Sequence, residues 1–355
     1  MSETAAASAT LAALMATAAL ISGLAIRALR RYASLLPADS PNARSLHVEP
    51  VPRAGGHAIW LGFLSVALLY PPQFPGGGIG WLIPWAALLG VSALDDVREV
   101  GVAYRLGVHA AASLWAAVWL VAAQRGVQVP AGLAVVEVAA AALAIAWAAN
   151  LYNFMDGNDG LAATMGIFGF GAYGVAALTG DVGTTASGIG ADGSAPAFLA
   201  LAAALIPFLV VNRPPATMFL GDAGAVPLGY LAAAFGLEGV VTARWPWWFP
   251  VLTFLPFVAD ATVTLLRRVL RRERIWEGHR GHYYQRLHRL GAGHRGTLGV
   301  YGCAMAGTAA SAVVCRAYAP AAGAPALALW IVAFIILFAT IDYHWRRRTA
   351  AVTSG

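Results

Sequence analysis

The chain has 355 residues, of which 59% are hydrophobic and only 11% are charged, and its mean hydropathy is +0.67. A soluble domain carries about 25% charged residues, so this composition excludes a soluble protein and indicates a membrane protein with many spans. The net charge of +6 comes from arginine as the only strong base, because the chain contains no lysine. Membrane topology explains this charge better than binding to nucleic acid does.

Apolar segments of about 18–22 residues recur from end to end, each long enough to cross a hydrocarbon core about 30 Å thick. We therefore predict an all-α polytopic integral membrane protein that forms one domain over residues 1–355. The first segment is apolar from its start and its first cation is Arg27. We expect it to be a retained span, since a signal peptide begins with a basic region. About eleven transmembrane helices are predicted: 9–29, 56–70, 79–94, 106–123, 131–150, 160–178, 196–211, 223–237, 247–268, 297–317 and 325–342.

The arginines orient these spans. With the N-terminus outside, twenty of the 23 arginines lie in cytoplasmic loops or helix ends, and Arg125, Arg244 and Arg316 remain outside. Cytoplasmic loops of membrane proteins are enriched in basic residues. The sequence therefore predicts that the N-terminus is outside and the C-terminus is cytoplasmic.

Two short acidic motifs fall at the ends of predicted spans on the cytoplasmic side. Asp95 and Asp96 end the third span, although such a pair by itself is more often a solvated helix end than a site. Asp222 stands between Gly221 and Gly224 where the eighth span begins, and it either caps that helix or holds a cation that anchors a phosphate. An ionisable group at membrane depth is costly and marks a functional site by default.

A third acidic stretch follows the fifth span and is the most specific of the three. Asn150, Asn153 and Asp156 are spaced at i, i+3 and i+6, so a continuing helix would align them along one side. Two glycines then break the helix and leave Asp159 on a turn. A lipid-facing helix would have no use for this composition, so we interpret the stretch as functional.

Carboxylates from the three stretches would repel one another unless a cation lay between them. Ligands that are all oxygen suit a hard divalent cation, which favours Mg²⁺, with Mn²⁺ as the alternative. The sequence has no Cys/His set with the spacing of a zinc site.

Basic residues in the cytoplasmic loops are candidate phosphate ligands. Arg53 lies just before Gly55 and Gly56. Two interpretations are equally good: it contacts a phosphate, or it is one of the basic residues that keep a loop on the cytoplasmic side. His279, Arg280 and His282 lie in the last large loop, where neighbouring arginines argue against metal binding and favour phosphate binding. Asp260, inside the ninth span, either pairs with an arginine of the following basic cluster or serves the site from behind, and we favour the structural ion pair.

Taken in order, these motifs resemble the polyprenyl-phosphate N-acetylhexosamine-1-phosphate transferase family, glycosyltransferase family 4. The histidine loop looks more like the O-antigen-initiating branch than the muramoyl-pentapeptide branch. Ala225 departs from the family pattern, which usually has serine there, and this puts a supporting hydrogen bond in doubt but not the metal ligand. The resemblance rests on the following segments: Arg44–Gly56, Leu94–Asp96, Asn150–Leu161, Phe219–Leu228, Asp260 and His279–Arg286.

The resemblance implies a reaction in the bacterial inner (cytoplasmic) membrane, with the active site on the cytoplasmic face. Undecaprenyl phosphate would attack the β-phosphorus of a UDP-N-acetylhexosamine and release UMP, directly or through an aspartyl-phosphate. This step would start synthesis of a lipid-linked surface polysaccharide such as the O-antigen of lipopolysaccharide. Implied partners also include membrane lipids and, because relatives are often dimers, a second copy of the chain.

The resemblance also implies roles for the candidate residues. Asp222 would be the principal Mg²⁺ ligand, and Asp95 would be the acceptor-side base or orienter, supported by Asp96. The donor or the metal would be held by Asn150, Asn153 and Asp156, the nucleotide by Asp159, and the phosphates by Arg53, His279, Arg280 and His282.

A transporter of an anionic substrate is the alternative function. Its site normally lies near the middle of the membrane between pseudo-symmetric halves, whereas the charges here cluster at one boundary. A non-catalytic scaffold would not need five clustered aspartates, so we favour the transferase.

Overall fold

The computed structural model describes residues 3–39, 50–98, 100–124, 131–179, 193–274 and 280–353. Nearly all of these residues are helical, and the strands found among them are β1 (Ala38–Asp39) and β2 (Val51–Pro52), which pair antiparallel. The longer helices are α1 (Glu3–Arg31), α2 (Gly55–Ala67), α3 (Gly77–Val97), α4 (Val102–Ala123), α5 (Ala131–Phe154), α6 (Leu161–Leu178), α7 (Ala195–Asn212), α8 (Asp222–Val241), α10 (Leu255–Leu270), α12 (Gly293–Tyr318) and α13 (Gly323–Thr353). Shorter helical turns are η1 (Ala33–Leu35), α9 (Trp248–Thr253), α11 (Tyr283–Leu287), η3 (His288–Ala292) and η4 (Pro320–Ala322).

Within the described ranges, nine helical segments are long and apolar enough to cross a membrane. They contain α1, α3, α4, α5, α6, α7, α8, α12 and α13. This finding confirms the predicted fold class, an all-α protein with many membrane spans. All eleven predicted spans are helical, but two of them differ from a simple crossing helix.

The two unusual spans are the second and the ninth. The second, α2, has 13 residues, which corresponds to about 20 Å at 1.5 Å per residue. The ninth is divided at Phe254 into α9 and α10. Pro256 lies at the start of α10, and because proline has no backbone N–H it cannot continue the hydrogen bonding of the preceding turn.

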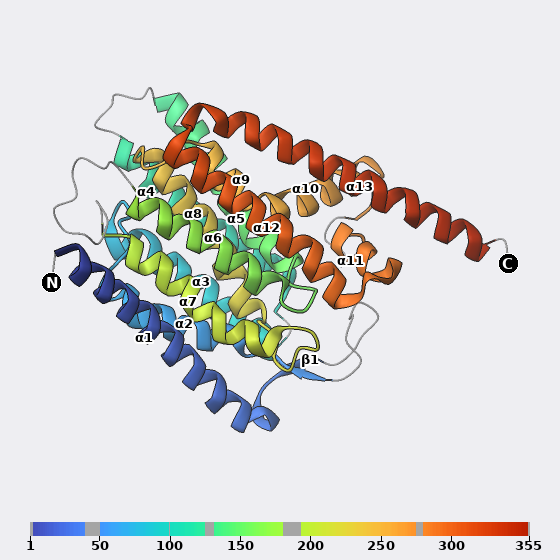
Figure 1. Ribbon diagram of the computed structural model, residues 1–355, viewed down its shortest axis with the longest axis horizontal. Coiled ribbons are helices and arrows are strands. Elements are labelled where there is room, and N and C mark those ends of the chain that lie inside the picture. The colour runs from blue at the N-terminus through green and yellow to red at the C-terminus, as the bar shows by residue number, and fades with distance from the viewer. Residues whose placement is uncertain are drawn as a thin grey trace.

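The helices lie side by side, with α1, α7, α6 and α12 in succession across one face (Figure 1). Helix α8 lies inside the bundle against α3 and α5. A Cβ on Gly229 of α8 would lie 2.3 Å from the carbonyl oxygen of Ala148 in α5, so only glycine permits this approach. The close packing brings the first residue of α8 near the end of α5.

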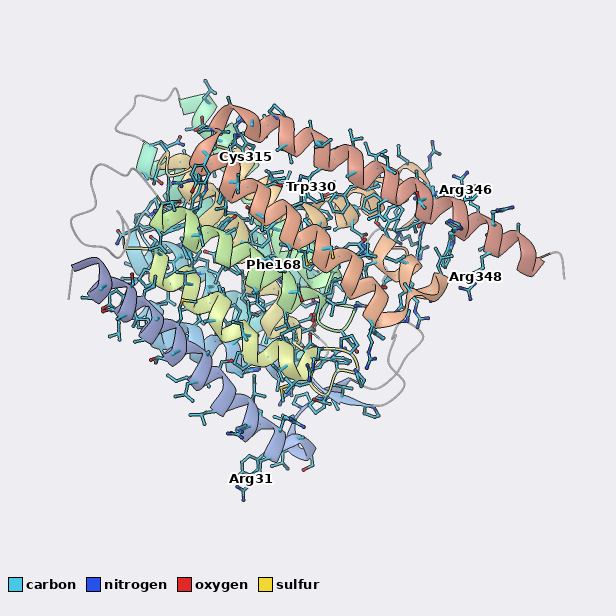
Figure 2. The ribbon with its side chains drawn as sticks, viewed as in Figure 1. Arg31, Phe168, Cys315, Trp330, Arg346 and Arg348 are labelled. Carbon is cyan, nitrogen blue, oxygen red and sulfur yellow. The ribbon has the colours of Figure 1, made fainter. Side chains whose placement is uncertain are left out.

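The C-terminal ends of α3 and α5 lie at the same end of the bundle as the N-terminal ends of α8 and α12. The end of α3 contacts the start of α8, and the loop after α5 contacts the start of α12. Arg31, Arg346 and Arg348 lie toward this end, whereas Cys315 lies at the opposite end (Figure 2). The three acidic stretches therefore share one end of the molecule, and the assignment of that end to the cytoplasm stays a prediction.

Candidate active site

Asp96 fixes the start of α8. Its two carboxylate oxygens accept hydrogen bonds from the backbone N–H groups of Asp222 and Ala223, each at 3.0 Å. Gly221 precedes the helix with φ of +76°, and a Cβ there would lie 2.7 Å from the Asp96 carboxylate. Asp96 thus satisfies free amides at the N-terminus of α8, where the helix dipole favours an anion.

Asp222 itself contacts side chains from two other helices. Its Oδ2 atom lies 3.4 Å from Arg105 Nη1 and 3.4 Å from Asn153 Nδ2. Arg105 also forms an ion pair with Asp95, whose second oxygen accepts the N–H of Val100 at 2.9 Å. A guanidinium therefore bridges the aspartates of α3 and α8.

Arg105 was missed as a site residue by the sequence reasoning, which counted it only as a topology signal. Its sequence position offers a signal, since it lies in the first turn of the helix that follows the Asp95-Asp96 pair. Ionisable residues in membrane segments tend to pair with one another, and Asp95 lies only ten residues before Arg105, across the short turn between α3 and α4.

Asp156 lies just beyond the end of α5 and is partly buried. Among the described residues, no donor makes a hydrogen bond to its carboxylate. Burial and the carboxylate of Asp222 raise the pKa of Asp156 well above its usual range, and Asp96 and Asp159 add to this effect. An added cation would relieve this repulsion.

Arg53 is the second cation of the cluster. It pairs with Phe219 in an isolated parallel bridge, and the next two hydrogen bonds run from Gly55 to Phe219 and from Gly56 to Leu220. Its positive charge acts on Asp96, Asp156 and Asp222. The backbone pairing thus places Arg53 near the carboxylates, and its role as a phosphate ligand stays a prediction.

Asp159 is held by residues of two other segments of the chain. Its Oδ2 accepts the N–H of Ala216 at 3.0 Å, and its Oδ1 lies 3.4 Å from His294 Nδ1. The next amide, Gly160 N–H, donates to Asn212 at 2.9 Å. Asp159 therefore joins the loop after α5 to the α7–α8 loop and to α12.

Asn150 lies apart from this cluster. It donates to Ala146 of its own helix and lies beside His109 of α4. His109 in turn lies near Arg105 and Asp95, so Asn150 reaches the site only through other side chains.

The histidine loop docks on α10 through Asp260, and the hydroxyl of Tyr284 in this loop donates to the carbonyl oxygen of Phe154 at the end of α5, at 3.0 Å. The fully buried carboxylate of Asp260 accepts the N–H groups of Tyr283 and Tyr284 at 2.9 Å each, and its Oδ1 lies 3.3 Å from His282 Nδ1. Tyr301 and Thr264 also donate to it. Asp260 therefore has a structural role, but the side chain beside its carboxylate is a histidine and not the arginine that was expected.

The three predicted residues of this loop have different positions. The ring of His282 is buried, with its centroid 6.0 Å from that of Phe154, two residues before Asp156. Arg280 lies near Arg289. His279 lies outside the described residues.

The donor set fits Mg²⁺ only in part. In the described part of the chain, no three His, Cys, Asp or Glu side chains form a ready metal cage. Asp96 is committed to backbone amides and Asp95 to Arg105. Asp156 and Asp222 remain, and two carboxylates suffice where substrate phosphates and waters complete the shell of Mg²⁺.

Comparisons with known proteins agree with this geometry. Residues 79–240, which contain the aspartates of the cluster, match the model of glycosyl transferase family 4. The chain is 27% identical to a probable undecaprenyl-phosphate N-acetylglucosaminyl 1-phosphate transferase of Bacillus subtilis, over 72% of this chain and 71% of the relative.

Two further relatives extend the likeness. A decaprenyl-phosphate N-acetylglucosaminephosphotransferase of Mycobacterium tuberculosis is 28% identical, over 79% of this chain and 76% of its own. A phospho-N-acetylmuramoyl-pentapeptide-transferase of Moorella thermoacetica is 32% identical, over 58% of this chain and 65% of the relative. The O-antigen-initiating branch stays a prediction. These matches, together with the order of the motifs, place the part of the chain from residue 79 to residue 240 in glycosyl transferase family 4.

Proposed function

We propose that this protein transfers N-acetylhexosamine-1-phosphate from a UDP-sugar to undecaprenyl phosphate in a bacterial inner membrane. The observation that carries the proposal is the convergence of Asp156 and Asp222 with Arg53 and Arg105 at one end of the bundle. This arrangement suits a diphosphate that arrives from water and an acceptor that is anchored in lipid. The names of the relatives, which pair a polyprenyl phosphate with an N-acetylated sugar phosphate, support the same substrate classes.

In the proposed reaction, an oxygen of the lipid phosphate forms a bond to the β-phosphorus of the donor. The bond from that phosphorus to the bridging oxygen breaks, and UMP leaves with the electron pair. A phosphate monoester has its second pKa near 6, so the nucleophile is already an anion and needs little help from a base.

Asp95 accordingly acts as an orienter in this proposal. One of its oxygens pairs with Arg105 and the other accepts the Val100 amide, so both are engaged. Asp95 thereby holds the guanidinium of Arg105 beside Asp222, where it can contact a substrate phosphate. Arg53, whose charge acts on Asp96, Asp156 and Asp222, would be the second cation to contact phosphate.

Asp222 and Asp156 would hold Mg²⁺, with Asn153 orienting the Asp222 carboxylate. When bound, the ion supplies positive charge that offsets the charge of the diphosphate and of the departing UMP. The guanidinium of Arg105 lies 3.4 Å from the Asp222 carboxylate, where it offsets part of the negative charge of the cluster.

The test is release of UMP by the purified protein given undecaprenyl phosphate and a panel of UDP-N-acetylhexosamines, with and without Mg²⁺. The expected result is UMP and a lipid-linked sugar diphosphate in equal amounts, only when Mg²⁺ is present. The Asp222→Asn protein, inserted normally in the membrane, should form neither product. Movement of a substrate across vesicles without nucleotide cleavage would overturn the proposal in favour of the transporter.

A further inference from the structure

A pocket whose lining includes none of the clustered aspartates opens on the molecule. It has a volume of about 610 Å³ and lies where α1 and α7 end and α12 begins. Arg30, Arg213 and Arg295, one from each of these places, line it together with apolar residues of α7 and the following loop. Three segments far apart in sequence thus bring three positive charges to one hollow.

Within the described part of the chain, the positive charge of these three arginines is not offset by acidic side chains. Among the described residues, no carboxylate pairs with any of the three guanidinium groups. The smaller basic pocket beside α10 offers a comparison. There, Arg267 and Arg286 pair with Asp342, at 2.6 and 2.7 Å. Of these two pockets, the pocket at α1, α7 and α12 therefore presents positive charge that no described carboxylate offsets, and this charge is available to a ligand.

An apolar strip leads from the lipid-facing side of α7 into the pocket. Ile206 and Val210 are 49% and 57% exposed and lie one helical turn apart, and Val210 lines the pocket itself. Residues four apart share one face of a helix. A ligand with a charged head and an apolar tail would find a complement for both parts.

We propose that this pocket binds the headgroup phosphate of an anionic phospholipid from the surrounding membrane. The arginines donate charge-assisted hydrogen bonds to the phosphate oxygens, and an acyl chain lies along Ile206 and Val210. Basic pockets between membrane helices suit such headgroups. This site does not depend on the proposed reaction, because none of its residues belongs to the aspartate cluster.

The pocket is nevertheless joined to the aspartate cluster through two neighbouring residues. Ala216, between the pocket residues Pro215 and Thr217, donates its N–H to Asp159. His294, which precedes Arg295, contacts the other oxygen of Asp159. A bound headgroup therefore stabilises the loop that carries Asp159.

The test uses the full-length protein in nanodiscs of equal parts phosphatidylcholine and phosphatidylglycerol. The pocket variant carries Arg30→Ala, Arg213→Ala and Arg295→Ala. The control variant carries Arg31→Ala, Arg346→Ala and Arg347→Ala and loses the same charge at the same end. After transfer to detergent, native mass spectrometry counts the phospholipids that each protein retains.

The pocket variant should retain at least about tenfold less phosphatidylglycerol than the unaltered protein, since one charged hydrogen bond is worth roughly that factor. The control variant should retain as much as the unaltered protein. Arg213→Ala alone should show a smaller loss, so the result does not depend on folding of the triple variant. Hydrogen exchange at the Asp159 and Gly160 amides should be slower in these nanodiscs than in pure phosphatidylcholine, except in the pocket variant.

Three results would overturn the proposal. The pocket variant could retain as much phosphatidylglycerol as the unaltered protein. The control variant could lose as much as the pocket variant, which would mean that net charge alone holds the lipid. Undecaprenyl phosphate in equal amount could displace the retained phosphatidylglycerol, which would assign the pocket to the acceptor.

Discussion

At the residue scale, the carboxylates of Asp96 and Asp156 differ in what surrounds them. Asp96 accepts two backbone amides at the N-terminus of α8, so its charge stabilises the fold. Asp156 has no hydrogen-bond donor among the described residues and lies close to like charges, which raise its pKa together with burial. The same substitution at these two positions should therefore have opposite effects on stability.

We predict that Asp156→Asn inactivates the protein without destabilising it. In Mg²⁺-free buffer its melting temperature should equal or exceed that of the unaltered protein, because burial and the neighbouring carboxylates raise the pKa of Asp156 and so disfavour its charge, whereas the amide is neutral and has a similar shape. Release of UMP should fall by about a hundredfold or more, because a carboxylate for the cation is lost. Both quantities can be measured on the same preparation, and a lower melting temperature would contradict this account of Asp156.

We predict that Asp96→Asn destabilises the protein even without a divalent cation. The amide keeps one acceptor, but its NH₂ group would face a backbone N–H of α8, and loss of a helix cap costs about 0.5–2 kcal/mol. Thermal unfolding in Mg²⁺-free buffer measures this effect, with Asp156→Asn as the matched control. Equal melting temperatures for the two variants would show that Asp96 does not cap α8.

At the scale of the elements, hydropathy predicted the helices well because span length and composition are local properties. It did not predict the division of the ninth span, since the sequence reasoning gave Pro256 no weight within an apolar run. Nor did it predict that Asp96 caps a helix that begins 126 residues later. Arg105 and the true partners of Asp260 were missed for the same reason, because contacts between distant segments leave no periodic pattern.

The packing of α8 on α5 should control the geometry of the site. Gly229→Ala would place a methyl group 2.3 Å from the Ala148 carbonyl oxygen, so the helices must separate, at a cost of about 1–3 kcal/mol. Separation would move Asp222 away from Asn153, and we predict lower activity as well as lower stability. Gly171→Ala in α6 is the control, because a Cβ there has no neighbour within 4 Å.

The experiment compares the melting temperature and the rate of UMP release for the two alanine variants. Gly171→Ala should be as stable as the unaltered protein or slightly more so, since alanine favours helix over glycine by up to about 1 kcal/mol. Loss of stability in both variants would mean that the close α5–α8 approach has no special role.

At the scale of the whole molecule, the two ends of the bundle have different chemistry. One end contains the aspartate cluster, the histidine loop and most of the arginines. Helix α13 is attached to this end because the carboxylate of Asp342 accepts hydrogen bonds from Arg267 and Arg286. At the other end, Arg316 binds the carbonyl oxygen of Arg244 and the hydroxyl of Thr179. Arg346 and Arg348 mark the first end, and Cys315 lies at the second (Figure 2).

This polarity gives a prediction about sidedness. The basic end should face the cytoplasm, because basic loops are retained there and the proposed nucleotide donor is cytosolic.

Single cysteines are introduced at exposed positions of a protein whose two native cysteines are replaced by alanine. Trp247→Cys reports on the end that holds Arg316, and Arg346→Cys reports on the end that holds the aspartates. A membrane-impermeant maleimide added to intact cells should label Trp247→Cys only, and permeabilised cells should label both. Labelling of Arg346→Cys in intact cells would place the aspartates outside, where no cytosolic UDP-sugar could reach them.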